Sequence, residues 1–277
     1  MRPALRVAIA TITSAAIVTV VSSREMASSS TLRLLYPVGV PNSHDPSGRG
    51  EPGPTDLRGY RLTYATHFPG SRLPRGWYSF SGVPGGTVGD VFSPAHVVIS
   101  RGVLQLNTFR DPRYQNRWIT AGICQCGRPF TYGAVFIRSR ITGPGPNSAE
   151  LLWPYSNVWP PEIDIYEDLA QPQLATESVH WGPPHRMETF QLRHFNTSAW
   201  HTWGVIWTPT SVTFTVDGYG WHRVVAPTPI PQIPMDVNIE QRTSCGTNSD
   251  CPSAPESLLV DWVAIYQPQH TPKKPRP

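Results

Sequence analysis

The alternation of apolar and polar positions along this chain predicts a series of short β-strands and almost no helix. Runs rich in Val, Ile, Thr and aromatic residues recur at regular intervals, and turn residues such as Asp217-Gly218 separate them. This spacing favours an all-β fold, a β-jelly-roll sandwich of two antiparallel sheets with one concave face as a cleft. We expect strands over residues 61–68, 97–100, 103–108, 119–123, 134–142, 149–153, 162–167, 177–181, 201–207, 212–216, 221–225, 237–241 and 258–266.

One of these strands carries the densest set of carboxylates in the chain. Residues 162–165 alternate acid and isoleucine, so in an extended strand Glu162 and Asp164 share one face and the isoleucines face a core. A strict period of two would put the next acid at Tyr166, but the acid is Glu167. One extra residue in the strand, a β-bulge, returns Glu167 to the face of the other two acids.

Two glutamates on one strand face are suited to acid/base chemistry at a shared centre. If both side chains lean together on a concave strand, their carboxyls approach the roughly 5–5.5 Å of a double-displacement glycosidase. The alternative interpretation is a solvated acidic edge strand, the usual explanation of a charge run. Such an edge would not need Pro160 and Pro161 on one side, nor isoleucines buried beneath the acids.

Composition indicates an exported β-rich protein. Charged residues make up only 15% of the 277 residues, against about 25% in typical soluble proteins, while Pro accounts for 31 residues and Trp for 10. We expect one domain over residues 57–268, which is long enough to bury a sizeable core.

The two ends of the chain have compositions of their own. In residues 1–23, Arg2 and Arg6 precede an uncharged run of Ala, Ile, Thr and Val, the layout of a signal peptide. An uncleaved membrane anchor is the alternative, although the run is short for a span. Residues 24–56 are predicted to be a flexible linker and residues 269–277 a basic tail. We therefore expect a secreted protein without stable membrane insertion after signal cleavage.

Four cysteines predict at least one disulfide in an oxidising compartment. Cys245 and Cys251 bracket a polar loop and are the favoured pair, whereas Cys124 and Cys126 are one residue apart and would close a strained ring. Three pairings are formally open. A zinc site is disfavoured, because the Cys-x-Cys has no second pair of matching spacing.

The charge balance argues against a nucleic-acid partner. The whole chain has a formal net charge of +4 and a pI near 9.0. Six basic residues lie near the two ends, however, and residues 31–270 contain 17 basic and 18 acidic residues, a net charge of −1. A nucleic-acid footprint would need an excess of basic residues clustered on the fold.

The acidic strand also carries a resemblance. Its Glu-Ile-Asp-Ile-Tyr-Glu is similar to the Glu-x-Asp-x-x-Glu signature of family 16 glycoside hydrolases, in the bulged form of laminarinases and related β-glucanases. The resemblance implies that Glu162 is the nucleophile, Glu167 the general acid/base and Asp164 the residue that tunes the pair. Weaker likenesses follow in the family's order, at residues 132–141, 151–154, 180–182, 201–204, 216–218 and 260–263.

Four further residues would bind substrate if the resemblance holds. Trp153 and Trp159 flank the acidic strand and would present flat faces on which sugar rings stack. His180 would bond sugar hydroxyls near Glu167, and Arg138 matches a cleft-facing arginine. The alternatives are a Trp buried in the core, a structural His and a solvated strand Arg.

The resemblance also bears on cofactors and on function. Many family members hold a structural calcium between an acid near the first strand and an Asp in the last. Asp261 matches the second position, but Thr66-His67-Phe68 stands at the first, and we expect no cofactor. The implied protein is a secreted, monomeric, retaining endo-β-glycosidase acting on a polysaccharide, by default β-1,3-glucan, with mixed-linkage glucans and galactans open. A transglycosylase with the same residues, or a non-catalytic lectin on the same fold, are the alternatives.

Overall fold

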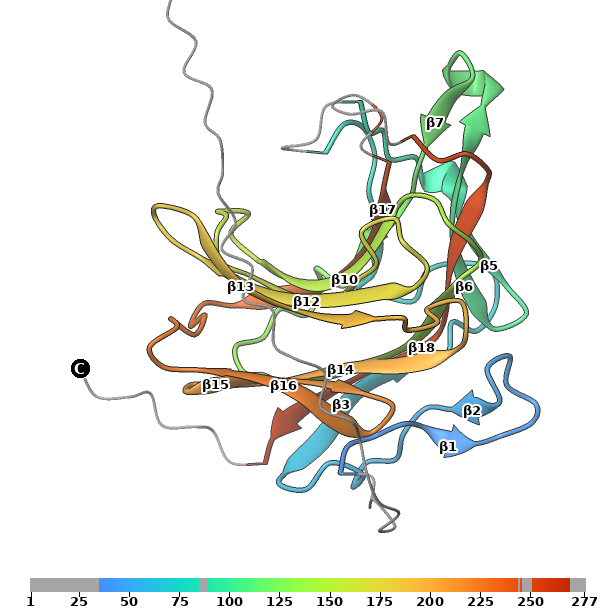
Figure 1. Ribbon diagram of the computed structural model, residues 1–277. Coiled ribbons are helices and arrows are strands. Elements are labelled where there is room, and N and C mark those ends of the chain that lie inside the picture. The colour runs from blue at the N-terminus through green and yellow to red at the C-terminus, as the bar shows by residue number, and fades with distance from the viewer. Residues whose placement is uncertain (1–34, 85–88, 244, 246–250, 270–277) are drawn as a thin grey trace, which may run out of the picture. The chain divides into compact units, whose positions relative to one another are not determined.

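The computed structural model describes residues 35–84, 89–243, 245 and 251–269. Its strands form two large antiparallel sheets that pack face to face (Figure 1), which confirms the predicted sandwich. The seven-stranded sheet has the order β13 (Arg186–Arg193), β12 (Leu174–Trp181), β11 (Glu162–Glu167), β10 (Asn147–Pro154), β17 (Met235–Arg242), β8 (Gly122–Cys124) and β4 (Tyr78–Ser79).

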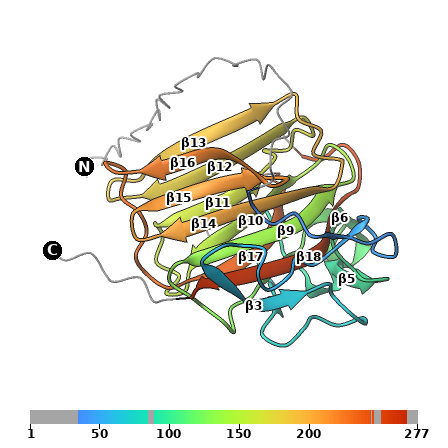
Figure 2. The ribbon, with the colours of Figure 1, turned by 90° about the horizontal axis from the view of Figure 1, so that it is seen from below.

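The second sheet has nine strands and lies below the first in Figure 1. Its order is β16 (Tyr219–Val225), β15 (Ser211–Val216), β14 (His201–Thr208), β9 (Gly133–Ile141), β18 (Glu256–Pro268), β6 (Val103–Asp111) and β5 (Val97–Ser100). Off this path, β3 (Tyr60–Thr66) pairs with β18 and β7 (Arg117–Ile119) with β6. Figure 2 shows that the strands of both sheets run in nearly the same direction, the aligned packing of a sandwich.

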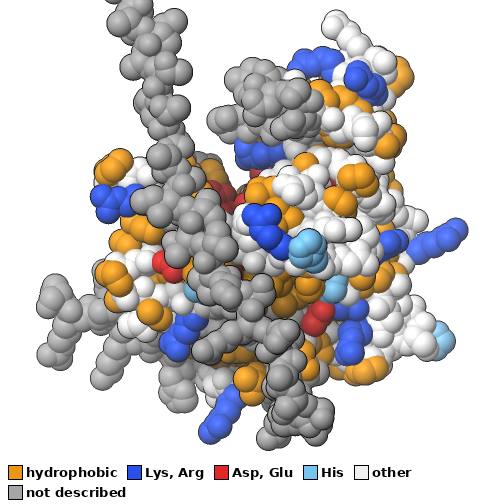
Figure 3. Space-filling model, in the orientation of Figure 1, with side chains coloured by type: hydrophobic (Ala, Val, Ile, Leu, Met, Phe, Trp, Pro, Cys, Tyr) orange, Lys and Arg blue, Asp and Glu red, His pale blue; other side chains and the backbone are white. Residues whose placement is uncertain are grey.

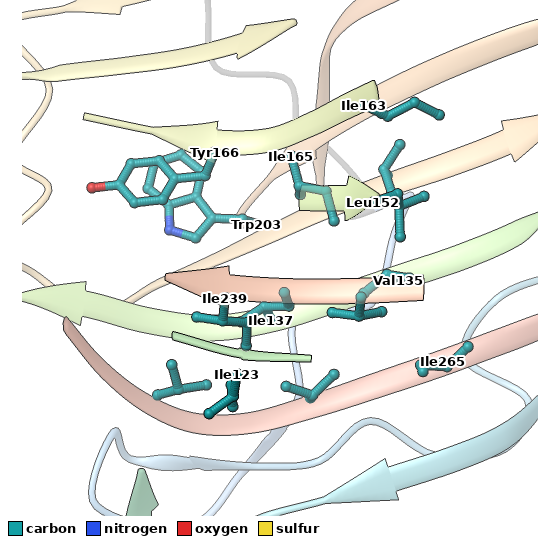
Figure 4. Close-up of a cluster of buried hydrophobic side chains, with 14 of the residues drawn as sticks. Ile123, Val135, Ile137, Leu152, Ile163, Ile165, Tyr166, Trp203, Ile239 and Ile265 are labelled. Carbon is teal, nitrogen blue, oxygen red and sulfur yellow. The ribbon is translucent and has the colours of Figure 1, made fainter. Parts of the chain in front are cut away.

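The core fills the space between the two sheets. Inward-facing side chains of β11, β10 and β17 meet those of β9, β14 and β18, and the largest are fully buried aromatic rings. Tyr166 of β11 stacks on Trp203 of β14 with ring centroids 4.3 Å apart (Figure 4). Each buried aliphatic or aromatic side chain stabilises the fold by about 1.5–3 kcal/mol. The other face of the seven-stranded sheet is turned away from this core.

The outer face of the nine-stranded sheet is covered by the segment of residues 35–57. This segment contains the two-stranded pair β1 (Val40–Pro41) and β2 (Arg49–Gly50). The indole of Trp262 donates to the carbonyl of Arg49 at 3.0 Å, and the Tyr266 hydroxyl donates to that of Gly53 at 2.6 Å. The predicted flexible linker of residues 24–56 is therefore wrong for residues 35–56, which are bound to the sheet.

Most of the predicted strands are confirmed, and the short strands β1, β2 and β4 were not predicted. The predicted strand 119–123 is divided between β7, which pairs with β6, and β8, which pairs with β17. Strand β13 was not predicted at all, because its Arg-Met-Glu-Thr-Phe-Gln-Leu-Arg sequence lies at the sheet edge and buries no residue fully. A polar edge strand has little apolar alternation for a sequence pattern to reveal.

Both cysteine pairs are disulfide-bonded. The predicted Cys245–Cys251 bond is confirmed, and Cys124 is bonded to Cys126 despite the single residue between them. The predicted signal peptide and nearly all of the predicted basic tail lie outside the described residues. Within the described ranges, no helix has the length and apolarity needed to cross a membrane.

Candidate active site

The free face of the seven-stranded sheet carries a continuous row of side chains across all its strands. Strand pairing aligns Tyr78, Cys124, Asn238, Leu151, Asp164, Ser178 and Thr189 in one line. A neighbouring row contains Glu240, Ala149, Glu167, Thr176 and Gln191. Figure 3 shows acidic side chains in a hollow of the molecular surface. The acids of β11 belong to the face of this sheet that is turned away from the core.

The predicted β-bulge is confirmed in β11. Asp164 pairs with Ser178 and Glu167 with Thr176, so three steps along β11 match two along β12. As a result Ile165 and Tyr166 are both buried in the core (Figure 4), and Glu167 follows on the cleft side. Without the extra residue, Glu167 would point into the apolar core.

Glu162 is bound by an indole that stands beside the cleft. Trp159, with 41% of its surface exposed, donates Nε1–H to Oε2 of Glu162 at 2.6 Å. Burial, together with the nearby carboxyl of Asp164, raises the pKa of Glu162 to about 8, and the indole bond opposes this rise. A carboxyl with a raised pKa is more basic once it is ionised, and it therefore binds protons and carbon electrophiles more strongly. Here the indole N–H of Trp159 remains as a fixed hydrogen-bond donor to that carboxylate.

Asp164 lies between the two glutamates and is only 2% exposed. Its Oδ2 lies 2.8 Å from Nε2 of His180, which stands on β12. Burial and the negative charge of Glu167 raise the pKa of Asp164 well above its usual value, while a hydrogen bond with the Glu162 carboxyl lowers it. Glu162 and Asp164 are neighbouring carboxyls on one face of the strand, so ionising both at once is disfavoured.

Glu167 has a different donor. Asn147 of β10 donates Nδ2–H to Oε1 of Glu167 at 2.9 Å, and the Thr176 hydroxyl donates to the backbone carbonyl of Glu167 at 3.2 Å. Burial raises the pKa of Glu167, and the Asn147 bond and His180 oppose the rise. A neutral, buried carboxylic acid at the floor of a cleft is a competent proton donor.

His180 and the two tryptophans lie at the site in different ways. The ring nitrogens of His180 are bound to Asp164 and, at 2.9 Å, to Nε2 of His185. His180 therefore orients a carboxyl, and its contact with sugar hydroxyls near Glu167 stays a prediction. Trp153 lies half-buried on β10, pairs with Asp236 of the cleft face, and donates its indole N–H to Asn157 at 3.0 Å.

The expected role of Arg138 is wrong. Arg138 belongs to β9 in the nine-stranded sheet, where its neighbour Ile137 faces the core, so Arg138 points to the opposite, outer face. Its guanidinium donates to Thr202 Oγ1 at 3.3 Å and lies 3.6 Å from the carboxylate of Asp217. The whole sandwich separates Arg138 from the cleft.

The sequence did not single out several polar residues of the concave face. They include Asn147, His185 and the ion pair of Glu240 with Arg242. The Arg242 guanidinium binds the Glu240 carboxylate at 2.5 Å in the row beside Glu167. The sequence did contain a pattern that could have revealed Glu240. Asp236, Asn238 and Glu240 alternate with buried apolar residues, as the acids of β11 do.

Among the described residues, the ligand atoms of Glu162, Asp164 and His180 lie within 4.8 Å of one another, close enough to hold a metal ion. Asp236 lies equally close to Cys124 and Cys126, but these sulfurs are joined in a disulfide and are not thiolate ligands. One acid of the calcium site implied by the resemblance is present. Oδ2 of Asp261 accepts the backbone N–H of Ser47 at 3.0 Å, and its buried Oδ1 has no hydrogen-bond partner among the described residues.

An antiparallel β-sandwich whose concave sheet carries three carboxyls on one bulged strand defines a jelly-roll hydrolase scaffold. The chain belongs to family 16 of the glycosyl hydrolases, whose family model matches residues 91–263. No curated protein matches the chain.

Solved structures share the fold at low sequence identity. The catalytic domain of an endo-1,3-β-glucanase (laminarinase) from Thermotoga petrophila is 18% identical, with a TM-score of 0.64 over 76% of this chain and 99% of its own. An endo-β-1,3-glucanase from Pyrococcus furiosus is 22% identical, with a TM-score of 0.62 over 75% and 94%. A non-specific endo-β-1,3(4)-glucanase of family 16 is 19% identical, with a TM-score of 0.67 over 85% and 97%.

Proposed function

We propose that this protein is a secreted, monomeric, retaining endo-β-glycosidase that hydrolyses a β-glucan. The observation that carries the proposal is the set of three carboxyls on one face of β11, each bound to a different donor: Trp159 on Glu162, His180 on Asp164 and Asn147 on Glu167. A binding protein on the same scaffold has no need of two buried glutamates, because ionisable groups are costly to bury without a chemical role.

In the first step Glu162 attacks the anomeric carbon and forms a covalent glycosyl ester. Glu167 protonates the glycosidic oxygen as it leaves. The attack needs Glu162 ionised, so Asp164 holds a proton at that moment, because ionising both neighbours is disfavoured. The indole N–H of Trp159 supports the carboxylate form of Glu162.

In the second step the roles of the two glutamates exchange. Glu167, now a carboxylate, takes a proton from water, and the resulting hydroxide attacks the anomeric carbon. The bond to Glu162 breaks and its carboxylate is restored. As the negative charge returns to Glu162, the proton held by Asp164 offsets part of the repulsion among the three carboxyls.

The substrate class we propose is a neutral β-1,3-linked glucan. Structures with the same fold include a laminarinase and endo-β-1,3-glucanases, which supports this choice. The acidic floor of the cleft also suits an uncharged polymer, because sulfate groups would meet carboxylates. Mixed-linkage glucans and galactans are the next candidates.

The test is a reducing-sugar assay of the protein, exported from a suitable host, against laminarin, mixed-linkage glucan, agarose and a sulfated galactan. We expect fastest release from laminarin and none from the sulfated polymer. Proton NMR in the first minutes of digestion should show the β-anomer first, as double displacement requires. Initial α-anomer would overturn the nucleophile role of Glu162, and products longer than the substrate would indicate transglycosylation. Binding to a polymer without cleavage would favour a lectin.

A further inference from the structure

His185 lies in the turn between β12 and β13, and its side chain is exposed. The turn is tight: a Cβ atom on Gly182 would lie 2.5 Å from the carbonyl oxygen of Pro184 and 2.9 Å from the Cα of His185. This path carries the chain back over the end of the concave face. An exposed turn residue is thereby placed beside the catalytic carboxyls.

The His185 ring contacts two residues that bind those carboxyls. Its plane is nearly parallel to that of His180, with ring centroids 5.2 Å apart and an interplanar angle of 9°. It also packs on Trp159, with centroids 4.6 Å apart. His180 binds Asp164 and Trp159 binds Glu162, so one side chain contacts the donors of two catalytic carboxyls.

The direction of the protons follows from the state of Asp164. When Asp164 is ionised, or holds its proton on Oδ1, its Oδ2 accepts and His180 donates through Nε2. Burial lowers the pKa of His180, which favours the neutral ring with a bare Nδ1. The partner of that Nδ1 is Nε2 of His185, 2.9 Å away, which must carry the hydrogen. The chain of donors therefore runs inward, from His185 to His180 to Asp164.

We propose that His185 is a positioning residue of the active site, whose Nε2–H occupies Nδ1 of His180 and so holds that ring with its own Nε2–H on Asp164. The same ring keeps Trp159 against Glu162. The charged groups that face His180 are the carboxyls of Glu162, Asp164 and Glu167 on β11, and none of them competes for Nδ1. This role rests on the proposed function, because it concerns how the nucleophile and its neighbour are held.

The experiment compares three substitutions at this exposed position. His185→Phe keeps an aromatic ring for Trp159 and removes the donor. His185→Gln places an amide N–H near the position of Nε2, whereas His185→Asn places it near Nδ1, too far back to reach His180. The control is His194→Asn, at another exposed histidine outside the cleft, where Asn tolerates the positive φ of 60°.

On the best polymer of the substrate screen, we expect His185→Phe and His185→Asn to lower kcat about fivefold to tenfold, the worth of one positioning hydrogen bond. KM should change less than about twofold, and His185→Gln should restore most of kcat. In the free protein, nitrogen NMR of the His180 ring should show its pKa raised by about 0.5–1 unit in His185→Phe, because an N–H no longer opposes protonation at Nδ1.

An unchanged kcat and an unchanged titration of His180 in His185→Phe would overturn the inference. A rise in KM alone would mean that His185 contacts the sugar, and an equal loss in the Gln and Phe variants would mean that no donor is needed. If no polymer is cleaved, the proposed function fails, and the His180 titration still decides whether His185 acts on Nδ1. Thermal unfolding of every variant shows whether the fold is retained.

Discussion

Two clusters of carboxyls lie on opposite sides of the seven-stranded sheet, and their surroundings differ. On the cleft side, Glu162, Asp164 and Glu167 each accept a hydrogen bond from a side-chain N–H. On the core side, Glu150 of β10 and Asp168 lie near Tyr166 together with Glu256 of β18 in the facing sheet. Burial raises the pKa of the Tyr166 hydroxyl, and these three carboxyls raise it further.

Burial raises the pKa of both sets, to about 8 for Glu150 and about 9 for Glu256 in the core. Neither of these core glutamates accepts an N–H from a described side chain, whereas Asp168 accepts backbone N–H groups of Ser148 and Ala170. A raised pKa therefore does not distinguish a catalytic carboxyl from a structural one. What distinguishes a catalytic carboxyl is that it faces the cleft and that a fixed hydrogen-bond donor supports its charged form.

The largest expected effect separates the two clusters by activity. Glu162→Gln and Glu167→Gln should each lower kcat by about a thousandfold or more while the fold persists, since each removes a group that reacts with substrate. Glu150→Gln, on the other face of the sheet, should keep most of the activity. In Glu162→Ala, added azide should restore the reaction and give a glycosyl azide of inverted configuration. Near-normal turnover in a folded Glu162→Gln or Glu167→Gln variant would contradict the catalytic role of that glutamate.

The second prediction concerns the core-side carboxyl of Glu150, whose titration should make the stability of the fold depend on pH. Glu150 titrates near 4.5 in the unfolded chain and at about 8 in the folded protein. Between these values the folded state holds a proton that the unfolded state has released, so stability falls as pH rises, by about 1.4 kcal/mol per pH unit for this group. We expect urea unfolding to show a more stable protein at pH 5 than at pH 8.

Glu150→Gln provides the control for that measurement. The amide has no proton to lose, so the decline of the free energy of unfolding between pH 5 and pH 8 should be shallower than in the wild type. If the free energy of unfolding of Glu150→Gln declines with pH as steeply as that of the wild type, the decline comes from other carboxyls. Glu256, with a pKa raised to about 9, is then the next substitution to measure.

Sequence alone anticipated the part of the site that follows from local periodicity. The alternation in residues 162–165 and the displaced acid at Glu167 define both the shared face and the bulge, because side-chain direction in a strand depends only on the register. The donors were harder to find. Asn147 and His185 belong to another strand and to a turn, and only the packing of strands brings them to β11.

Two further misses have a similar physical origin. Arg138 lies among apolar neighbours in β9, and the sequence does not say to which sheet, and hence to which face, a strand belongs. Residues 35–56 have no apolar period. They are held by Trp262 and Tyr266, which donate to backbone carbonyls that any sequence would offer.

A third prediction concerns the effect of Asp164 on the ionisation of Glu162. Because Glu162 acts as a carboxylate and its pKa is raised to about 8, the acid limb of kcat/KM should lie well above pH 4.5. Asp164→Asn removes a charge that contributes to this rise, so the limb should move to lower pH by about one unit, with a lower maximum. The measurement is a pH profile of both proteins on the same substrate. If kcat/KM of the wild type falls off on the acid side only near pH 4.5, the raised pKa of Glu162 is contradicted.

The smallest effect tests the donor that distinguishes Glu162 from the core glutamates. Trp159→Phe keeps an aromatic face beside the cleft and removes the indole N–H on Oε2. That bond lowers the pKa of Glu162, so its loss should raise the acid limb of kcat/KM and reduce kcat by about threefold to tenfold. Trp153→Phe is the matched control, because its indole N–H binds Asn157 and no carboxyl. Equal losses of kcat in the two variants, without a shift of the limb, would mean that Trp159 contributes only its face to substrate binding.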